Sequence, residues 1–187
     1  MIPRIVYPIA AGVLLLALLA LPVTSAAAAA RAPRVRPLPI VAGGGIVSTF
    51  GPRGSRYHYG IDVGAPTGTP VRVPEGGVVA SAYPDGQVSG YGNVVATAHG
   101  DHGLLFAHLA SMTVRAGDRV EPGQIIGYVG STNSEGGFHT SGPHLHWEVI
   151  VPPPGSDLLR DLAHYTGSSP PRIDPVEWAR ARGLAIV

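Results

Sequence analysis

The sequence predicts an all-β protein: antiparallel sheets in a compact sandwich-like or barrel-like domain that ends in short helical segments. Glycine and proline are abundant, at 26 and 19 of 187 residues, while charged residues make up only 13%. This composition is more typical of turn-rich β proteins than of helical bundles. Between Ile46 and Ile150, short apolar runs alternate with Gly, Pro, Asp and Asn, and no apolar repeat of helical period runs through them.

Charge and cysteine content narrow the function classes. The formal net charge is +1 and the basic residues form no cluster, so we do not expect a nucleic-acid partner. Cysteine is absent. This excludes disulfides, thiol catalysis and thiolate zinc sites, and it leaves His, Asp and Glu as possible metal ligands.

Residues 1–30 are predicted to be a secretory signal peptide. Arg4 precedes an almost unbroken apolar run over residues 5–21, and small residues follow at 26–30. An uncleaved membrane anchor is the alternative, because a run of ~17 residues is at the lower limit for spanning a bilayer. Both interpretations place the remaining chain outside the cytoplasm, secreted or in the cell envelope, with membrane contact only through this segment. Residues 31–45, rich in Pro, Arg and Gly, are predicted to be a flexible tether.

The folded domain is predicted over residues 46–187, with a core at about 50–151 and a C-terminal extension at 152–187. Six strands are expected, at residues 69–73, 77–83, 92–99, 103–109, 124–129 and 144–151. Residues 100–103 suit a tight hairpin, and His99 and His102 beside it are expected to be exposed.

The C-terminal extension is predicted to be helical and to pack on the β domain. Prolines 152–154 and Gly155 break the last strand, and a short helix is expected at residues 157–165, with Asp157 or Ser156 as its cap. A second helix is expected from residue 175 to about residue 182. Asp174 would be its N-cap, and Pro175 would occupy the first helical position.

Two histidines on the last predicted strand indicate a metal site. His144 and His146 are two residues apart, so on a strand both side chains point to the same face. His58 and Asp62, far upstream, flank a glycine-containing bend. If such groups converge, they form a catalytic zinc site of the open type, with water as fourth ligand. Taken singly, these motifs also fit ordinary surface or strand histidines.

Eight blocks extend the pattern over roughly Phe50 to Val151: Phe50–Arg53, His58–Asp62, Gly68–Val71, Gly90–Val95, Phe106–Leu109, Gly117–Val120, Gly123–Gly130 and Gly142–Glu148. In these blocks and their order, the chain resembles the lysostaphin-type (LytM-type) zinc endopeptidases, which cut the peptide part of bacterial peptidoglycan. The resemblance implies a secreted zinc metallo-endopeptidase acting on stem or cross-bridge peptides. The chain departs from the family in the short segment between Arg53 and His58 and in residues 152–172. A particular cross-bridge specificity therefore does not carry over to this chain.

The resemblance also implies a role for five residues. His58, Asp62 and His146 match the ligands of one zinc ion, and His144 and His108 match the two non-ligand histidines. We expect His144 to be the general base and His108 to donate to the tetrahedral oxyanion, although the two could exchange roles. A non-catalytic module that binds peptidoglycan or activates a hydrolase is the alternative, against which the intact ligand set argues. A biotinyl or lipoyl carrier domain is excluded because the chain has no lysine.

Three further residues have weaker predictions. Glu148 shares a face with His146, and we expect a solvated charge there, with orientation of the ligand imidazole as the alternative. His139 lies in the loop 131–142, which leads into the predicted ligand strand. An ordinary loop position is expected for it, with a place in the substrate groove as the alternative. No partner is expected for His164.

Overall fold

A ten-stranded sheet organises the part of the chain that the computed structural model describes, residues 38–85, 87–88, 90–131, 142–164 and 171–187. All strand pairs are antiparallel. The main path runs in the order β1 (Gly45–Ser48), β4 (Ile61–Gly64), β11 (His144–Ile150), β8 (His102–Met112), β7 (Asn93–His99), β6 (Gly77–Tyr83) and β9 (Arg119–Val120). The predicted all-β, antiparallel fold class is confirmed.

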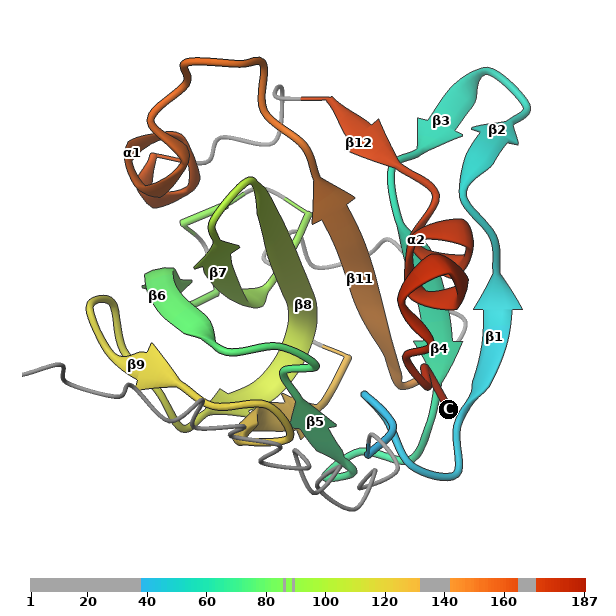
Figure 1. Ribbon diagram of the computed structural model, residues 1–187. Helices are drawn as coiled ribbons and strands as arrows, with labels where there is room; N and C mark the ends of the chain where they lie inside the picture. The colour runs from blue at the N-terminus through green and yellow to red at the C-terminus, as the bar shows by residue number, and fades with distance from the viewer. Residues whose placement is uncertain (1–37, 86, 89, 132–141, 165–170) are drawn as a thin grey trace, which may run out of the picture. The chain divides into compact units, whose positions relative to one another are not determined.

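Five short strands lie off this path. β10 (Ile125–Val129) pairs with both β5 (Pro70–Arg72) and β8, and β12 (Arg172–Ile173) pairs with β11. β2 (Gly51–Arg53) and β3 (Arg56–His58) form a separate hairpin, which projects from the sheet beside β12 in Figure 1. All six predicted strands are present within three residues of their expected ends. The strands that were not predicted have only two to four residues each, too few for an alternating pattern.

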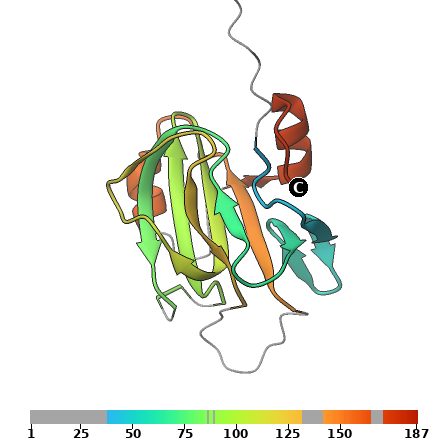
Figure 2. The same ribbon diagram turned by 90° about the horizontal axis from the view of Figure 1, so that it is seen from below.

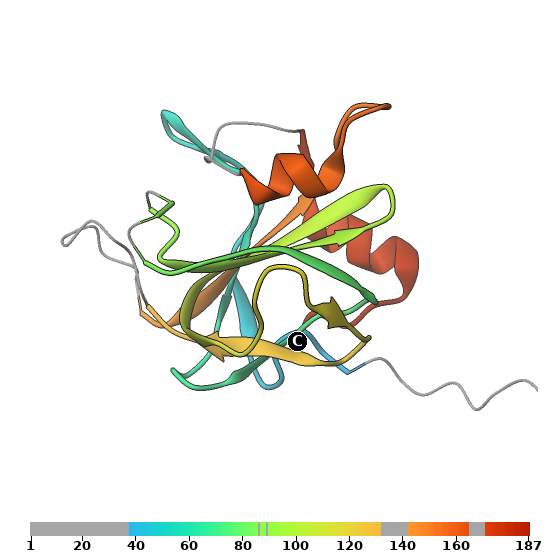
Figure 3. The same ribbon diagram turned by 90° about the vertical axis from the view of Figure 1, so that its left-hand side faces the viewer.

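The sheet buries apolar side chains on both faces. Alternate residues of each strand face opposite sides. On one side, Val95, Phe106 and Trp147 join the larger core with residues of β5 and β10. On the other side, Val94, Ala96 and Leu105 pack with Leu158 and Leu162 of α1 (Leu158–Ala163). Figure 3 shows α1 on one side of β6–β8 and the β9–β10 layer on the other.

Two helices follow the sheet and begin where their capping residues predict. The Asp157 side chain accepts a hydrogen bond from the backbone N–H of Arg160 (3.1 Å). In α2 (Pro175–Arg182), the Asp174 side chain caps Val176 (2.8 Å), and Gly183 ends the helix at φ 65°. The Trp178 ring of α2 meets Trp147 of β11 edge-on, with ring centroids 6.0 Å apart. The two helices therefore lie on opposite sides of the sheet (Figure 2).

The described end of the predicted tether differs from the expectation, because it belongs to the folded unit. Ile40 and Val41 have no exposed surface. Their backbone N–H groups donate to the carbonyls of Ala185 (3.2 Å) and Ile186 (3.0 Å). The short apolar run at residues 38–41 enters the core, although proline and glycine dominate the composition around it. The predicted signal peptide, residues 1–30, lies outside the described residues, and among the residues that are described no helix has the length and apolar character to cross a membrane.

Leu162→Ala should lower the free energy of unfolding by about 2–5 kcal/mol, because a fully buried leucine of α1 would leave a cavity against the sheet. Urea unfolding of the purified protein measures the change. Leu159→Ala is the matched control, since Leu159 lies on the same helix but is 47% exposed; its effect should stay within about 0.5 kcal/mol. Equal effects of the two substitutions would show that α1 is not packed on the sheet as described.

Candidate metal centre

Three side chains from separate strands converge on one point. His58 ends β3, Asp62 lies in β4, and His146 lies in β11, where it is the register partner of Asp62. His58 Nε2 is 3.1 Å from Asp62 Oδ1 and 3.0 Å from His146 Nδ1. Asp62 Oδ1 is 3.0 Å from His146 Nδ1. All three residues are buried. A tetrahedral zinc ion with bonds of 2.0–2.1 Å would separate its ligand atoms by about 3.3 Å, so the triangle is close to the size such an ion requires.

The protonation of the two imidazoles makes this triangle a site for a cation. His58 Nδ1 lies 2.8 Å from the Thr49 carbonyl, which can only accept, so Nδ1 carries the hydrogen and Nε2 a lone pair. His146 Nε2 donates to the Glu148 carboxylate at 3.0 Å, which turns Nδ1 toward the other two atoms. Lone pairs of two nitrogens and a carboxylate oxygen therefore face one another. Their repulsion is relieved only by a proton or a metal ion, and the donor set is one that zinc prefers.

Arg53 of β2 holds the carboxylate of the triangle from outside. Its Nη2 donates to Asp62 Oδ2 at 2.6 Å and also contacts Ser48 Oγ. The same nitrogen lies 2.9 Å from His58 Nδ1, but that ring nitrogen donates to Thr49 and cannot accept a second hydrogen. Arg53 thus occupies Oδ2 and leaves Oδ1 for the shared point. Its block was part of the family resemblance, but no role was predicted for it.

The local charges shift the pKa values of the ligand candidates in opposite directions. Burial would raise the pKa of Asp62, but hydrogen bonds from His146, His58 and Arg53 outweigh it and hold that pKa far below its usual value. Burial would lower the pKa of His146, but hydrogen bonds to Asp62 and Glu148 outweigh it and raise that pKa to about 9. Without a metal ion, His146 therefore retains a proton at neutral pH.

Glu148 is fully buried, so the prediction of a solvated charge is wrong. Its Oε1 accepts hydrogen bonds from His146 Nε2 (3.0 Å) and the Tyr91 hydroxyl (2.7 Å). Its Oε2 accepts from Arg172 Nε at 2.9 Å. Burial would raise the pKa of Glu148, but His146 and then Arg172 outweigh it and lower that pKa to about 2. Glu148 therefore contacts the imidazole of His146 as an ionised carboxylate.

The remaining two histidines of the predicted site, His144 and His108, lie beside the triangle. His144 Nδ1 donates to the Gly142 carbonyl at 3.0 Å, so its Nε2 has a lone pair, and that atom is 3.8 Å from Asp62 Oδ1. The ring centroid of His108 is 4.8 Å from that of His144 and 5.9 Å from that of His146. Among the described residues other than glycine, His108 alone has positive φ, at 60°. The structure therefore brings all five predicted residues together.

A β-bulge explains the unusual backbone of His108. Asn93 and Val95 of β7 pair with Leu109 and Phe106 of β8, so β8 contains one extra residue between these two pairs. The extra residue breaks the alternation of faces and allows the His108 ring to reach the rings of β11. Positive φ at a non-glycine residue costs on the order of 1–3 kcal/mol and occurs most often at functional sites.

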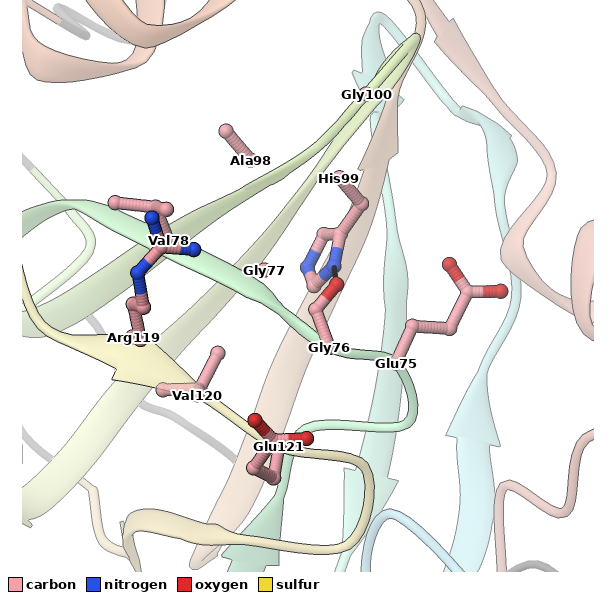
Figure 4. Close-up of a pocket in the computed structure, with 10 residues that line it drawn as sticks. All are labelled: Glu75, Gly76, Gly77, Val78, Ala98, His99, Gly100, Arg119, Val120 and Glu121. Carbon is pink, nitrogen blue, oxygen red and sulfur yellow. Dashed lines mark hydrogen bonds between the residues drawn. The ribbon is translucent and has the colours of Figure 1, made fainter.

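A second histidine cluster lies at the other ends of β7 and β8. His99 and His102 were predicted to be exposed, but they are only 9% and 5% exposed. The ring nitrogens of His102 lie 2.9 Å from a carboxylate oxygen of Glu75 and 2.8 Å from one of Asp101, and its ring stacks on His99. His99 lies at the edge of a pocket of about 500 Å³, with Nδ1 bonded to the Gly76 carbonyl at 2.9 Å (Figure 4). Burial lowers the pKa of His99.

Of the two other histidines that were considered, His164 lies among the described residues. His164 is exposed, and its Nδ1 bonds to the Arg160 carbonyl at the end of α1. His139 lies outside the described residues.

Residues 56–156, more than half of the sequence, match the family described as peptidase family M23. The chain belongs to peptidase family M23. The predicted resemblance to lysostaphin-type enzymes is confirmed. Over 97 residues the chain is 43% identical to the DD-carboxypeptidase/endopeptidase Mpg of Neisseria meningitidis serogroup B. This alignment covers 51% of this chain and 20% of that protein. The chain thus spans about a fifth of that relative's length.

Solved structures of other M23-like peptidases have the same fold. The antimicrobial peptidase lysostaphin from Staphylococcus simulans aligns with a TM-score of 0.56 and 30% identity, over 75% of this chain and 50% of that one. A zinc-containing peptidase from Vibrio cholerae aligns with a TM-score of 0.52 and 30% identity, over 60% of this chain and 35% of that one. M23 peptidases are zinc-dependent as a family, which agrees with the donor set of the triangle.

Zinc affinity should rise about tenfold per pH unit between about pH 6 and pH 8, because zinc must displace the proton that the raised pKa keeps on His146. Calorimetry in two buffers of different ionisation enthalpy measures the release directly, and about one proton per zinc is expected. Zinc binding that releases no proton and does not change with pH would contradict this electrostatic description.

The buried His99 should make stability fall as the pH falls. Because its pKa is depressed in the folded protein, the unfolded chain takes up the proton first, so stability is lost from about pH 6.5 downward, toward the folded pKa. His99→Gln should reduce the loss in unfolding free energy between about pH 7.5 and pH 5. The exposed His164→Gln is the control and should show the wild-type loss. Identical pH dependence in all three proteins would show that His99 is not buried in neutral form.

Proposed function

We propose that this chain is an extracytoplasmic zinc-dependent endopeptidase that hydrolyses peptide bonds in the stem or cross-bridge of bacterial peptidoglycan. The observation that carries the proposal is the triangle of His58 Nε2, Asp62 Oδ1 and His146 Nδ1, with two more imidazoles beside it. Family membership supports the peptidase activity. The names of the Neisseria relative, lysostaphin and the Vibrio cholerae peptidase support a peptidase with a zinc ion.

His58, Asp62 and His146 would hold one zinc ion. When bound, it would polarise the carbonyl of the scissile peptide bond and lower the pKa of a water molecule toward neutrality. Three protein ligands leave a coordination position for the reactants, which is typical of catalytic and not of structural zinc sites. Arg53 and Glu148, which hold Asp62 and His146 from behind, would fix the orientation of two of the three ligands.

We assign the general base to His144. Its Nδ1–H is committed to the Gly142 carbonyl, so the lone pair on Nε2 is the group that faces the triangle. That nitrogen would accept a proton from the attacking water and then deliver it to the leaving amine. Sequence also permitted His108 in this role; the hydrogen bond of His144 to Gly142 favours His144.

We assign to His108 the stabilisation of the oxyanion that forms on the substrate carbonyl. The bulge in β8 holds its imidazole against His144 and His146 on the open side of the triangle. A hydrogen bond from a ring N–H to the developing negative charge would be stronger in the transition state than in the ground state. The strain at φ 60° is consistent with a side chain whose direction is set before the substrate arrives.

Metal removal and two histidine substitutions test the proposal on defined muropeptides. A chelator should abolish peptide cleavage, and added zinc should restore it. His146→Ala should lose both zinc and cleavage. His144→Ala should retain zinc but lower kcat by about 10²- to 10⁴-fold, because a general base is removed while the ligands remain.

His164→Ala is the control, because this exposed histidine lies at the end of α1, and it should cleave at the wild-type rate. The non-catalytic module predicts a different result: binding to peptidoglycan without zinc and without cleavage. Cleavage that survives His146→Ala would overturn the proposed site.

A further inference from the structure

β12, a strand within the C-terminal extension, lies close to the candidate metal centre. β11 pairs with β8 on one edge and with β4 on the other, through residues 144–147. β12 pairs with two residues further along β11, Val149 with Ile173 and Ile150 with Arg172. In Figure 1, β4 and β12 follow one another along β11. The extension therefore delivers Arg172 to the same edge of β11 that β4, the strand of Asp62, occupies.

Arg172 contacts both segments that contain the ligand candidates. Its Nε donates to Glu148 Oε2 at 2.9 Å, and Glu148 in turn accepts from His146. Its guanidinium carbon lies 4.9 Å from the centroid of the Tyr59 ring, and Tyr59 stands between His58 and Asp62 in the chain. The Arg172 side chain is only 4% exposed. One guanidinium thus spans the turn between β3 and β4 and the adjacent part of β11.

The turn beneath Arg172 is tightly packed against β11. A Cβ atom added to Gly60 would lie 2.4 Å from the Trp147 carbonyl oxygen and 3.0 Å from His146 Cε1. The turn and β11 are therefore in direct contact, and a small shift of His146 would alter the whole triangle. Arg172 is itself fixed, since the Pro171 carbonyl before it accepts from Val151 N (2.9 Å) and Asp174 after it caps α2.

Charge explains why the carboxylate of Glu148 needs this arginine. A buried carboxylate is stable only when it is paired and its lone pairs are satisfied. The ring N–H of His146 and the hydroxyl of Tyr91 satisfy Oε1, and Arg172 satisfies Oε2 with a full positive charge. Without the arginine, the carboxylate would turn toward water or take up a proton, and the imidazole of His146 would lose its fixed acceptor.

We propose that Arg172 is a positioning residue of the zinc site, through which the C-terminal extension holds Glu148 and thereby directs Nδ1 of His146 at the metal. The inference rests on the proposed function, because it requires that His146 binds zinc. Arg172 touches neither the metal nor the substrate in this role. Its loss should therefore change zinc affinity and the coordination geometry.

Arg172→Gln should weaken zinc binding about 10- to 100-fold, the usual effect of losing a residue that holds a ligand. Competition with a chromogenic chelator measures the dissociation constant in the full chain, and unfolding of the metal-free protein measures stability separately. The d–d absorption spectrum of the Co²⁺-substituted protein should change, because the His146 ring is no longer held. In a Glu148→Gln background, Arg172→Gln should cost little further affinity, because the arginine acts through the carboxylate.

Arg182→Gln is the matched control. Arg182 belongs to the same C-terminal extension, lies over an aromatic ring (Trp178, 4.3 Å) and approaches a glutamate (Glu75, 3.7 Å). Glu75 belongs to the second histidine cluster, and the Trp178 ring lies 5.1 Å from that of His102 in the same cluster. The zinc affinity and the Co²⁺ spectrum of Arg182→Gln should be those of the wild type.

The outcomes separate the inference from the proposed function. If Arg172→Gln lowers stability but binds zinc as tightly as the wild type, with an unchanged Co²⁺ spectrum, the inference is wrong and the proposed function stands. If the wild type binds no zinc, the proposed function fails and the inference fails with it. If Arg172→Gln does not fold, Arg172→Lys replaces it. Lysine keeps the charge but lacks the planar donor, so binding should weaken about threefold or more, and unchanged affinity would overturn the inference.

Discussion

The register between β4 and β11 is the constraint on which the rest of the structure depends. It places Asp62 opposite His146 and Gly64 opposite His144, so two of the three ligand candidates, Asp62 and His146, face one another across a single strand pair. Because side chains alternate along a strand, a slip of one residue would turn both histidines into the apolar core and bring Leu145 and Trp147 to the site. Trp147, with no exposed surface and in contact with Trp178, prevents that slip. The hydrophobic core thus fixes the geometry of the metal centre.

Around this strand pair, three polar groups from different directions fix the three ligand candidates. Arg53 occupies the outer oxygen of Asp62, the Thr49 carbonyl fixes the tautomer of His58, and Glu148 fixes the ring of His146. Each of these contacts leaves one lone pair for the shared point. The arrangement is stable only with a cation or a proton there, so the protonation of His146 and the proposed binding of zinc would compete with each other. Arg172 extends the same network into the C-terminal extension.

The sequence predicted those features that depend on short-range pattern. The period of two in strands predicted that His144 and His146 share a face, and capping residues predicted where both helices begin. Features that depend on long-range contacts were missed. Alternation would have placed His108 with Phe106 in the core, and only the bulge reverses this. Glu148 looked solvated because its partner Arg172 lies 24 residues away, and His102 looked exposed because Glu75 lies 27 residues away. The meeting of His58, Asp62 and His146 was predictable only through family resemblance.

The central claim is that three named atoms bind one zinc ion. Anomalous diffraction at the zinc edge from crystals of the zinc-loaded protein tests it most directly. The structure predicts one strong peak at about 2.0–2.2 Å from His58 Nε2, Asp62 Oδ1 and His146 Nδ1 together. A peak elsewhere, or coordination of His146 through Nε2 in place of its hydrogen bond to Glu148, would contradict the account.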